Sequence, residues 1–582
     1  MANLIEEAKK QIDVLVREAY RRAAEKGTLP AGCSLGGTIE IPKDTVYGDY
    51  ACGYAMASAR EMRRAPRQIA EALAAELDLT DSFFSKMEIA GAGFMNFTLS
   101  GKWYGEVLRT VEAEGPAYGS GDLGRGKRVI VEFVSANPTG PMHIGNARGG
   151  VLGDSLAEVL KRCGYGVWRE FYVNDAGNQI QKFAASLNAR YMQLLLGEDA
   201  FPFPEDGYQG DDIRELAQAF RGEYGDAYRD APEAERLEKL AAFGLARNIP
   251  KMQSDLRRYN IEYDQWFLES ELHSSGYVEE TVALLTERGW TYTADGALWL
   301  ATSKLLRQRY LAEGKTDEQV DKLDLKDDVL RRANGVYTYF AADIAYHRNK
   351  LEKRGFDLAV NVWGADHHGH VARLQAALDA LGLDGTHRLV IVLMQLVNLL
   401  RDGEAVRMSK RTGKAIALAD LLDEIHVDAA RYFFNSRASD THLDFDLGLA
   451  VRQDSENPVY YVQYAHARIC SLIANLAEAG HRVKPMAEID ASVLREETEL
   501  DLLKQLSLLP EELALAARDF DPSRINRYLG NVAARFHRFY NACRIKGEEE
   551  ALLDARLKLA DSTRAVIAAG LGIIGVTAPE KM

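Results

Sequence analysis

The sequence predicts a multidomain protein of the α/β plus α class. A parallel-sheet core split by an insertion is expected, with a small N-terminal α/β domain before it and a C-terminal all-helical bundle after it. Three observations favour this fold: short apolar runs alternate with helical spacing in mid-chain, a long charged segment interrupts them, and the sequence beyond about residue 455 is helical throughout. With 582 residues and about 100–200 residues per domain, three or four domains are expected.

The composition excludes a uniformly basic nucleic-acid-binding surface. The chain is 47% hydrophobic and 27% charged, which is ordinary for a globular protein with a large core. Its 71 basic and 86 acidic residues give a formal net charge of -15. Any RNA binding must therefore use local basic surfaces.

Other features of the sequence indicate a cytoplasmic protein. Five cysteines occur without a C-x-x-C pair, which argues against a disulfide framework or a thiolate zinc site and fits a reducing compartment. The chain begins with an amphipathic charged helix pattern that lacks the apolar centre of a signal peptide. No run of about 18 apolar residues predicts a membrane span.

Residues 1–115 are expected to form the small α/β domain. An opening helix is followed by a turn-rich segment at 41–56, a helix at 66–77 and a strand at 93–99. Glycine and proline residues within 115–127 mark the exit from this domain.

Residues 116–454 are expected to form the core. The apolar run RVIVEFV (128–134) is typical of a parallel strand that is buried on both faces. A Pro- and Gly-rich turn leads from it into a helix, and GVWREFYV (166–173) is a second strand. Strand, turn, helix and strand make a right-handed βαβ unit of a Rossmann-like sheet. The apolar face of that helix is formed by Leu152, Leu156, Val159 and Leu160.

Two later apolar runs, 357–364 and 388–394, supply further strands of this sheet. Between the two pairs lies a charged, largely helical insertion at about 180–330. Its DGALWL piece resembles a hairpin, which suggests a small embedded subdomain.

Residues 455–582 are expected to form the helical bundle. In the segment INRYLGNVAARFHRFYNACRI, apolar residues recur at steps of three and four and predict one buried stripe. The stripe consists of Leu529, Val532, Phe536, Phe539 and Cys543. The opposite side of the helix carries Arg527, Asn531 and Arg538.

The turn PTGPMHIGN places a histidine, a glycine and a helix N-terminus within a few residues. A helix N-terminus presents unpaired N–H groups and partial positive charge, which suit an ATP phosphate. Gly145 lets an adenine ring approach the backbone, and His143 can donate to a phosphate oxygen as charge builds up. The triplet H-x-G alone more often marks an ordinary βα turn.

The loop VRMSKRTGK (406–414) is rich in cations and follows the last predicted core strand. Lys410 could neutralise the pyrophosphate leaving group, and Ser409 could orient it. A basic loop alone is more often a solvated surface.

Taken together, the turn and the loop resemble the HIGH and KMSKS motifs of class I aminoacyl-tRNA synthetases. Asn146 stands in place of the last histidine of HIGH, while Arg407 and Arg411 replace the first lysine and last serine of KMSKS. Asn146 can still donate to a phosphate, and the central Lys410 is retained. The resemblance assigns catalysis to His143, Asn146, Ser409 and Lys410, and ATP contacts to these residues with Gly145 and Met408.

Longer stretches resemble the arginyl members of that class. They include VEFVSANPTGPMHIGNARGG, YTYFAADIAYH, WGADHHGH, QLVNLLRDGEAVRMSKRTGK and the final LGIIGVTAPEKM, and they span essentially the whole chain. The resemblance implies an arginine–tRNA ligase that uses ATP with Mg²⁺, has L-arginine and tRNA(Arg) as its partners, and holds no metal of its own. A cytoplasmic monomer without a membrane partner is expected.

The physics of a guanidinium group agrees with this resemblance. A planar fork of donors with permanent charge is best held by carboxylates and amide oxygens. By resemblance, Tyr339 and Asp343 bind the guanidinium; they lie four residues apart on a predicted helix and so share one face. The resemblance also implies that Glu132 and Asn137 bind the amino-acid end of the substrate. It adds three further arginine contacts: Ser135, His143 and His367. Alternatively, Glu132 could pair structurally with an arginine, and Tyr339 could belong to the core.

The segment WGADHHGH contains three histidines that could suggest zinc, but no fourth ligand is apparent nearby. The resemblance instead places Gly364 and Asp366 against the ATP ribose. A carboxylate can accept hydrogen bonds from the ribose hydroxyls. Three further residues are expected to line the same pocket: Asn174, Asp175 and Gln179.

Contacts to tRNA are expected at both ends of the chain. By resemblance, Phe94 and Asn96 of the N-terminal domain touch the tRNA D-loop, although GFMNF could equally be a plain strand. In the helical region, Tyr461, Tyr464 and Arg468 share one predicted helix, where aromatic rings can stack on splayed anticodon bases. Tyrosines at this spacing are more often core.

Three rival functions remain open. One is a class I synthetase for another amino acid, another a catalytically silent RNA-binding relative, and the third a small-molecule nucleotidylyltransferase. An acidic pocket argues against glutamyl or glutaminyl specificity, which would need a cation. Further domains on both sides of the core argue against the nucleotidylyltransferase.

Overall fold

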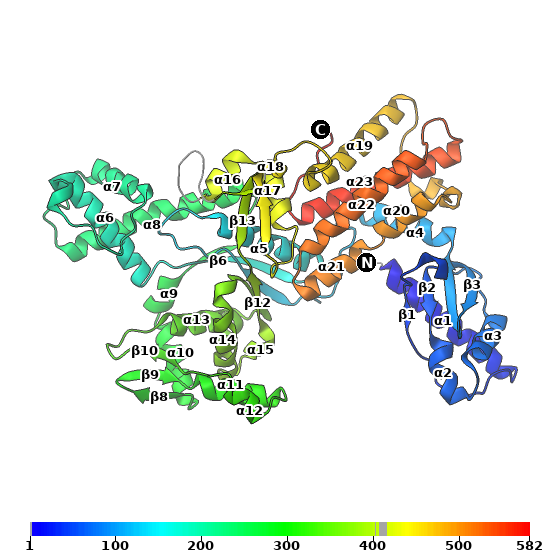
Figure 1. The fold of residues 1–582 in the computed structure, drawn as a ribbon, viewed down its shortest axis with the longest axis horizontal. Helices are drawn as coiled ribbons and strands as arrows, with labels where there is room; N and C mark the ends of the chain where they lie inside the picture. Colours follow the sequence, from blue (N-terminus) through cyan, green and yellow to red (C-terminus); the bar gives the residue numbers. More distant parts are fainter. Residues whose placement is uncertain (1–2, 402, 407–415) are drawn as a thin grey trace.

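A computed structural model describes residues 3–401, 403–406 and 416–582 (Figure 1). It confirms the predicted fold class, because a parallel sheet occupies the middle of the chain, a small α/β unit precedes it and helices follow it. Within these residues, no helix is both long enough and apolar enough to cross a membrane.

The N-terminal unit is an antiparallel sheet in the order β1-β2-β4-β3, covered by helices. The expected helix at 66–77 and strand at 93–99 are both present. The segment at 41–56 also holds a strand of three residues and the start of a helix, which are too short to show periodicity. The elements are α1 (Leu4–Glu25), β1 (Ile39–Glu40), β2 (Tyr50–Cys52), α2 (Tyr54–Met62), α3 (Pro66–Glu76), β3 (Phe84–Ala90), β4 (Phe94–Leu99) and α4 (Gly101–Glu114).

The central sheet has the order β12-β11-β5-β6-β7, with all neighbours parallel. All four predicted core strands are confirmed. The sheet strands are β5 (Arg128–Glu132), β6 (Gly166–Val173), β7 (Gln265–Leu268), β11 (Leu358–Gly364) and β12 (Leu389–Met394). The crossover helix between the first two is α5 (Ile144–Arg162), whose predicted apolar residues are all buried.

Strand β7 lies inside the range expected for the insertion, so the insertion is divided in two. This strand has only four residues, too few for the sequence to distinguish it from the helices around it. Before it come α6 (Asn178–Leu196), α7 (Asp211–Tyr224) and α8 (Glu233–Arg258), which share a separate hydrophobic cluster. In Figure 1 these helices extend away from the sheet.

After β7 the predicted hairpin is present as β8 and β9, joined by β10 in a small antiparallel sheet. This part comprises α9 (Glu269–Ser274), α10 (Tyr277–Glu287), β8 (Thr291–Ala294), β9 (Ala297–Leu300), α11 (Thr302–Ala312), α12 (Asp317–Asp321) and β10 (Asp328–Arg331). The chain then enters α13 (Tyr339–Arg348), which ends in a π-helical turn, Asn349–Lys353.

A second small sheet, in the order β14-β13-β15, follows the central one and was not expected from the sequence. Its strands lie on either side of residues 407–415, where the cation-rich loop falls. The elements of this region are α14 (His368–Ala380), α15 (Gly385–Arg388), β13 (Val397–Arg401), β14 (Glu404–Ala405), α16 (Leu418–Glu424), α17 (Val427–Phe434), β15 (Leu443–Asp446) and α18 (Leu447–Ala450).

The C-terminal region is helical, as predicted. Its helices are α19 (Pro458–Glu478), α20 (Glu497–Leu506), α21 (Leu509–Asp519), α22 (Ser523–Ala542) and α23 (Glu550–Ile573). The whole predicted stripe of α22 is buried, and Arg527, Asn531 and Arg538 are exposed.

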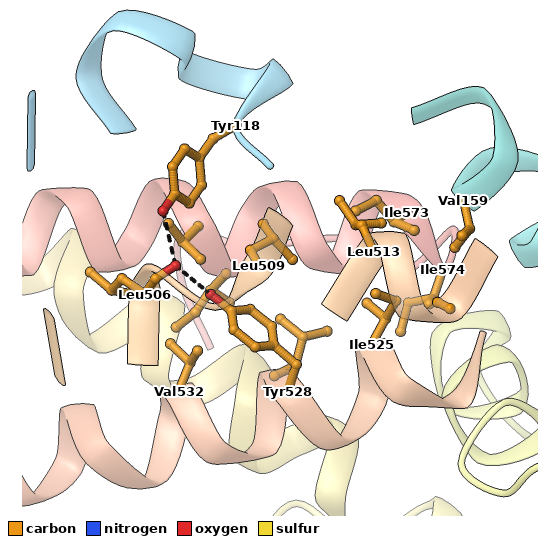
Figure 2. Packing of buried hydrophobic residues seen from close by; sticks show 14 of the residues in the cluster. Tyr118, Val159, Leu506, Leu509, Leu513, Ile525, Tyr528, Val532, Ile573 and Ile574 are labelled. Atoms are coloured by element: carbon orange, nitrogen blue, oxygen red, sulfur yellow. Dashed lines mark hydrogen bonds between the residues drawn. The ribbon is translucent and has the colours of Figure 1, made fainter. Parts of the chain in front are cut away.

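The helical region packs directly against the central sheet unit. Figure 2 shows Val159 of α5 in the same hydrophobic cluster as Leu513 and Ile574. The hydroxyls of Tyr118 and Tyr528 both donate to the carbonyl of Leu506, at 3.0 and 3.1 Å. A buried phenol needs such a partner, so these bonds fix how the bundle meets the segment that enters the core.

Candidate functional site

The site lies where β5 and β11 end, at the carboxyl edge of the central sheet. In open α/β sheets, ligands bind at this edge. Two adjoining cavities occupy it, with volumes of about 490 and 670 Å³. They share four lining residues, Val134, Ser135, Asp366 and His367, so one elongated molecule or two reacting ones could occupy both.

The second cavity faces the turn before α5. His143 is the N-cap of α5, and its Nδ1 accepts from the amide of Gly145 at 3.2 Å. The side-chain oxygen of Asn146 accepts in return from the amide of His143 at 3.0 Å. This reciprocal pair is a capping box, so Asn146 stabilises the helix start that faces the cavity.

His143 is held as a neutral hydrogen-bond donor. Partial desolvation by the surrounding protein lowers its pKa below the usual value. Because Nδ1 accepts the Gly145 amide, the ring proton lies on Nε2, the atom that can donate to a ligand. An anion in the second cavity would meet this donor and the helix N-terminus together.

Replacing Asn146 by alanine should lower the stability of the protein by about 1 kcal/mol, because one half of the capping box is lost. Urea unfolding followed by circular dichroism measures this change. Asn146→Asp keeps an acceptor at the same place and should retain most of the stability. Equal losses in the two variants would contradict a capping role.

The backbone before this turn is strained. Val134 and Ser135 have φ angles of 68° and 41°, in the left-handed region that residues other than glycine rarely adopt. The conformation turns the Ser135 hydroxyl back, so that it donates to Oε1 of Glu132 at 2.9 Å and accepts from the amide of Tyr172 at 3.2 Å. It thereby fixes a carboxylate in the wall of the first cavity.

Glu132 has a structural partner, but that partner is a lysine. Oε2 of Glu132 accepts from Nζ of Lys350 at 2.5 Å, and both side chains are almost completely buried. Glu132 nevertheless lines the first cavity, so the pair does not remove it from reach of a ligand.

Asp343 also lines the first cavity, with Trp363, His370 and Arg373. It lies on α13, and its Oδ2 is 3.0 Å from Nε2 of His370. With Glu132 and Asp366, three carboxylates line this cavity. This charge pattern favours a cationic ligand.

Tyr339 is on the same helix but lines a third cavity, of about 420 Å³, together with Asn178 and Glu269. Its side chain is 47% exposed, and its hydroxyl accepts from the amide of Asn178 at 3.2 Å. The structure therefore does not bring Tyr339 and Asp343 into one cavity, and Tyr339 is not a core residue.

The end of β11 supplies the residues common to both cavities. A Cβ atom at Gly364 would lie 2.4 Å from Oδ1 of Asp366, so a larger residue there would displace this carboxylate. The side chains of Asp366 and His367 are 80% and 58% exposed, and both face the shared space. An exposed carboxylate here can accept from sugar hydroxyls.

Among the remaining predicted residues, Asn137 lines the second cavity. Asp175 instead accepts from the amide and hydroxyl of Ser270, at 2.9 and 2.6 Å. The amide of Asn174 faces the Glu269 carboxylate, and Gln179 accepts from the hydroxyl of Tyr208. The latter three residues line neither the first nor the second cavity.

Sequence reasoning missed the contribution of the insertion to the second cavity. Tyr208, which precedes α7, and Asp212, in its first turn, line it together with His143. Burial raises the pKa of the Asp212 carboxyl. No signal in the sequence pairs these residues with the turn at His143, because only the folding back of the insertion brings them there.

Met408, Ser409 and Lys410 lie outside the described residues. The chain that follows them returns to the site. Ala417 pairs with His143 in an antiparallel bridge, and the amide of Leu418 donates to the carbonyl of Met142 at 2.8 Å. The chain at Ala417 and Leu418 therefore lies beside the N-terminus of α5.

The residues predicted to touch tRNA line neither of these two cavities. On β4, Phe94 is 37% exposed, whereas Asn96 is 8% exposed and its Oδ1 has no hydrogen-bond partner. Tyr461, Tyr464 and Arg468 all lie on α19. Tyr464 is exposed and stacks on Tyr460, Tyr461 packs on His537, and Arg468 lies over the ring of Tyr540.

The three histidines of WGADHHGH do not converge on a common point with other ligands. In the described part of the chain, no three His, Cys, Asp or Glu side chains are grouped so that they could hold a metal ion. His370 instead contacts Asp343, and His367 contacts Asp366.

Family models match three stretches of the chain. The model described as the arginyl tRNA synthetase N terminal domain matches residues 10–99. The catalytic domain of class I tRNA synthetases (R) matches residues 113–214 and 238–446. The DALR anticodon binding domain matches residues 462–582.

Relatives that match over the full length of the chain belong to the same family as these models. The arginine–tRNA ligases of Acetivibrio thermocellus and Caldanaerobacter subterraneus subsp. tengcongensis are 49% and 50% identical to this chain over 582 residues, and the matches cover all of both chains. A solved structure from Campylobacter jejuni, described as an arginyl-tRNA synthetase, is 34% identical with a TM-score of 0.73, over 83% of this chain and 100% of that one. The arginyl-tRNA synthetase of Thermus thermophilus shares the fold, with a TM-score of 0.69 at 23% identity over 97% and 99%.

Proposed function

Because the chain belongs to the arginyl-tRNA synthetases, a class I family of aminoacyl-tRNA synthetases, we propose that it joins L-arginine to tRNA(Arg) at the expense of ATP. The observation that supports this specificity best is the acidic first cavity, which directly adjoins a second cavity at a helix N-terminus. The first suits a guanidinium and an ammonium group, and the second suits a phosphate.

The reaction has two steps. The arginine carboxylate attacks the α-phosphorus of ATP, pyrophosphate leaves, and arginyl-adenylate forms. A hydroxyl of the terminal ribose of the tRNA then attacks the adenylate carbonyl, and AMP leaves. The enzyme positions the reactants and stabilises charge, so it needs no covalent nucleophile.

We assign the arginine to the first cavity. Asp343 accepts from the guanidinium, and Glu132 accepts from the α-amino group. Ser135 and His367, which line both cavities, surround the carboxyl end together with Asn137 and His143 of the second cavity. Tyr339 can contact the guanidinium only if its ring turns from the third cavity towards Asp343.

We assign the ATP to the second cavity and the shared space. His143 donates to a phosphate from Nε2, and Gly145 and Asn146 form the start of the helix that faces the phosphates. Gly364 and Asp366 receive the ribose. Mg²⁺ would be held largely by the phosphates themselves. The sequence motif adds Met408, Ser409 and Lys410 to the residues that we assign to ATP.

The proposal extends to tRNA recognition and cellular setting. Phe94 and Asn96 would meet the D-loop, and Tyr461, Tyr464 and Arg468 the anticodon arm. The division of the chain near residues 115 and 455 belongs to the same proposal, as does action as a cytoplasmic monomer. The family models that match separate stretches support such a division.

Charging of total bacterial tRNA with each of the twenty amino acids tests the function. Arginine alone should be attached, and His143→Asn should lower the rate about a hundredfold, because one donor to the reacting phosphate is misplaced. Asparagine is a good N-cap, so α5 should keep its start. Charging with another amino acid would refute the specificity, and tRNA binding without any charging would favour the silent RNA-binding relative.

A further inference from the structure

Lys350 is a buried cation that contacts Glu132, a residue in the wall of the first cavity. It lies on the π-helical turn that follows α13, and its side chain is 0% exposed. Nζ donates to Oε2 of Glu132 at 2.5 Å and to Oδ1 of Asn361 at 3.2 Å, and it lies 4.1 Å from the centre of the Tyr346 ring. Single π-helical turns of this kind occur frequently at functional sites.

The three partners of Lys350 are themselves held in place. The Tyr346 hydroxyl donates to Glu170 at 2.7 Å, and Glu170 also accepts two bonds from Arg354. Asn361 lies on β11 and is fully buried. The ammonium therefore has little freedom, and it fixes one oxygen of Glu132 as Ser135 fixes the other.

Folding alone gives little reason to keep this ion pair. A buried pair is often replaceable by apolar residues of similar volume without loss of stability, because removing two charges from water is costly. Glu132 is not only a partner of Lys350, since it also lines the cavity. A carboxylate there is useful only if it keeps its orientation before a substrate arrives.

The same lysine is connected to the guanidinium end of the cavity. Asn361 donates through Nδ2 to Nε2 of His347 at 2.8 Å, and Nδ1 of His347 donates to the backbone carbonyl of Asp343 at 2.8 Å. Burial lowers the pKa of His347 well below its usual value, so the ring is neutral and one tautomer satisfies both bonds. One buried network thus joins the Glu132 carboxylate to the backbone of Asp343.

We propose that Lys350 is a positioning residue for arginine, which holds the Glu132 carboxylate oriented to receive the substrate's α-amino group. The inference rests on the proposed function, because it takes arginine as the ligand of the first cavity. Lys350 itself touches no substrate atom in this scheme. Its effect is confined to the amino end of the ligand.

The test compares L-arginine with 5-guanidinopentanoate, which lacks only the α-amino group. Calorimetric titration of the full chain gives the two dissociation constants. The wild type should prefer arginine by about 10–150-fold, the range expected for a hydrogen bond to a charged group. In Lys350→Met this preference should fall to within about threefold, while 5-guanidinopentanoate binds nearly as before.

Lys353→Met is the matched control, because Lys353 lies on the same turn and is exposed. It should keep the wild-type preference. If Lys350→Met keeps the preference as well, or if the wild type has none, the inference is overturned. Wild-type charging of tRNA with arginine in parallel separates this result from a failure of the proposed function.

A second comparison covers the case in which Lys350→Met does not fold. Glu132→Gln/Lys350→Met removes both charges and leaves none unpaired. If Lys350 acts through Glu132, the double variant should bind arginine as Glu132→Gln does, within about threefold. A further loss in the double variant would show a separate role for Lys350 and would overturn the inference.

Discussion

Asp343→Asn should lower kcat/KM for arginine by about a thousandfold. Truncating or neutralising one partner of a buried charge pair costs several kcal/mol, and each 1.4 kcal/mol is a factor of ten. The loss should appear mainly in KM for arginine, with little change in KM for ATP, because Asp343 lines the first cavity and not the second. Initial rates of tRNA charging at varied arginine and ATP measure both constants.

The asparagine should leave the fold intact, since its oxygen can still accept from His370. Asp379→Asn on α14 is a suitable control, because Asp379 accepts from the amide and hydroxyl of Thr386 and lines no part of the first two cavities. It should charge arginine at nearly the wild-type rate. A rise in KM for ATP alone would place Asp343 at the nucleotide and contradict the assignment.

Charge should matter more than shape at this position. Citrulline carries a neutral urea where arginine carries a guanidinium, with nearly the same outline. The wild type should therefore bind arginine far more tightly than citrulline, and Asp343→Asn should reduce that difference by about two orders of magnitude. Competition by citrulline in the charging assay measures it.

The sequence predicted the sheet because its strands are unusually distinct. RVIVEFV and RLVIVLM are nearly continuous apolar runs, as expected for parallel strands covered on both faces. The strand QWFL is too short for that pattern, and β13 and β14 lie next to the cation-rich loop, where charge obscures their alternation. Tertiary pairing, which local sequence does not encode, decides such short strands.

The site was predictable where a residue acts through its place in a motif. His143 and Gly364 sit at a helix start and a strand end, and both positions follow from local pattern. The pairing of Glu132 with Lys350 joins residues more than two hundred positions apart and depends on a π-helical turn that no periodicity announces. Helical spacing alone also misled for Tyr339. It shares a helix face with Asp343 but lines a different cavity.

Arg431 is the residue whose loss should most destabilise the junction between the catalytic core and the helical region. Its side chain on α17 is fully buried. It donates to the carbonyls of Tyr259, Asn260 and Ile574, at 3.0, 3.0 and 2.9 Å, and to Oδ2 of Asp154 at 2.5 Å. One guanidinium therefore joins the ends of α8 and α23 to α5.

Gly575 reveals how closely the chain packs around this group. A Cβ atom there would lie 2.3 Å from the Arg431 guanidinium, and the φ angle of 66° also favours glycine. Arg431→Met keeps most of the side-chain volume but leaves three carbonyls and a carboxylate with fewer donors. We expect a loss of about 3 kcal/mol, at the low end for a broken buried pair, because Arg169 still donates to Asp154 at 3.2 Å.

Urea unfolding followed by tryptophan fluorescence and by circular dichroism measures this loss. Arg437→Met, at an exposed arginine nearby, should change stability by less than about 0.5 kcal/mol. Asp154→Asn/Arg431→Met should recover part of the loss, because no carboxylate is then left short of a cation. If the loss of stability in the double variant equals the sum of the losses in the two single variants, the ion pair contributes little. The hydrogen bonds to the carbonyls then hold the junction together, and the helical region is fixed by geometry instead of charge.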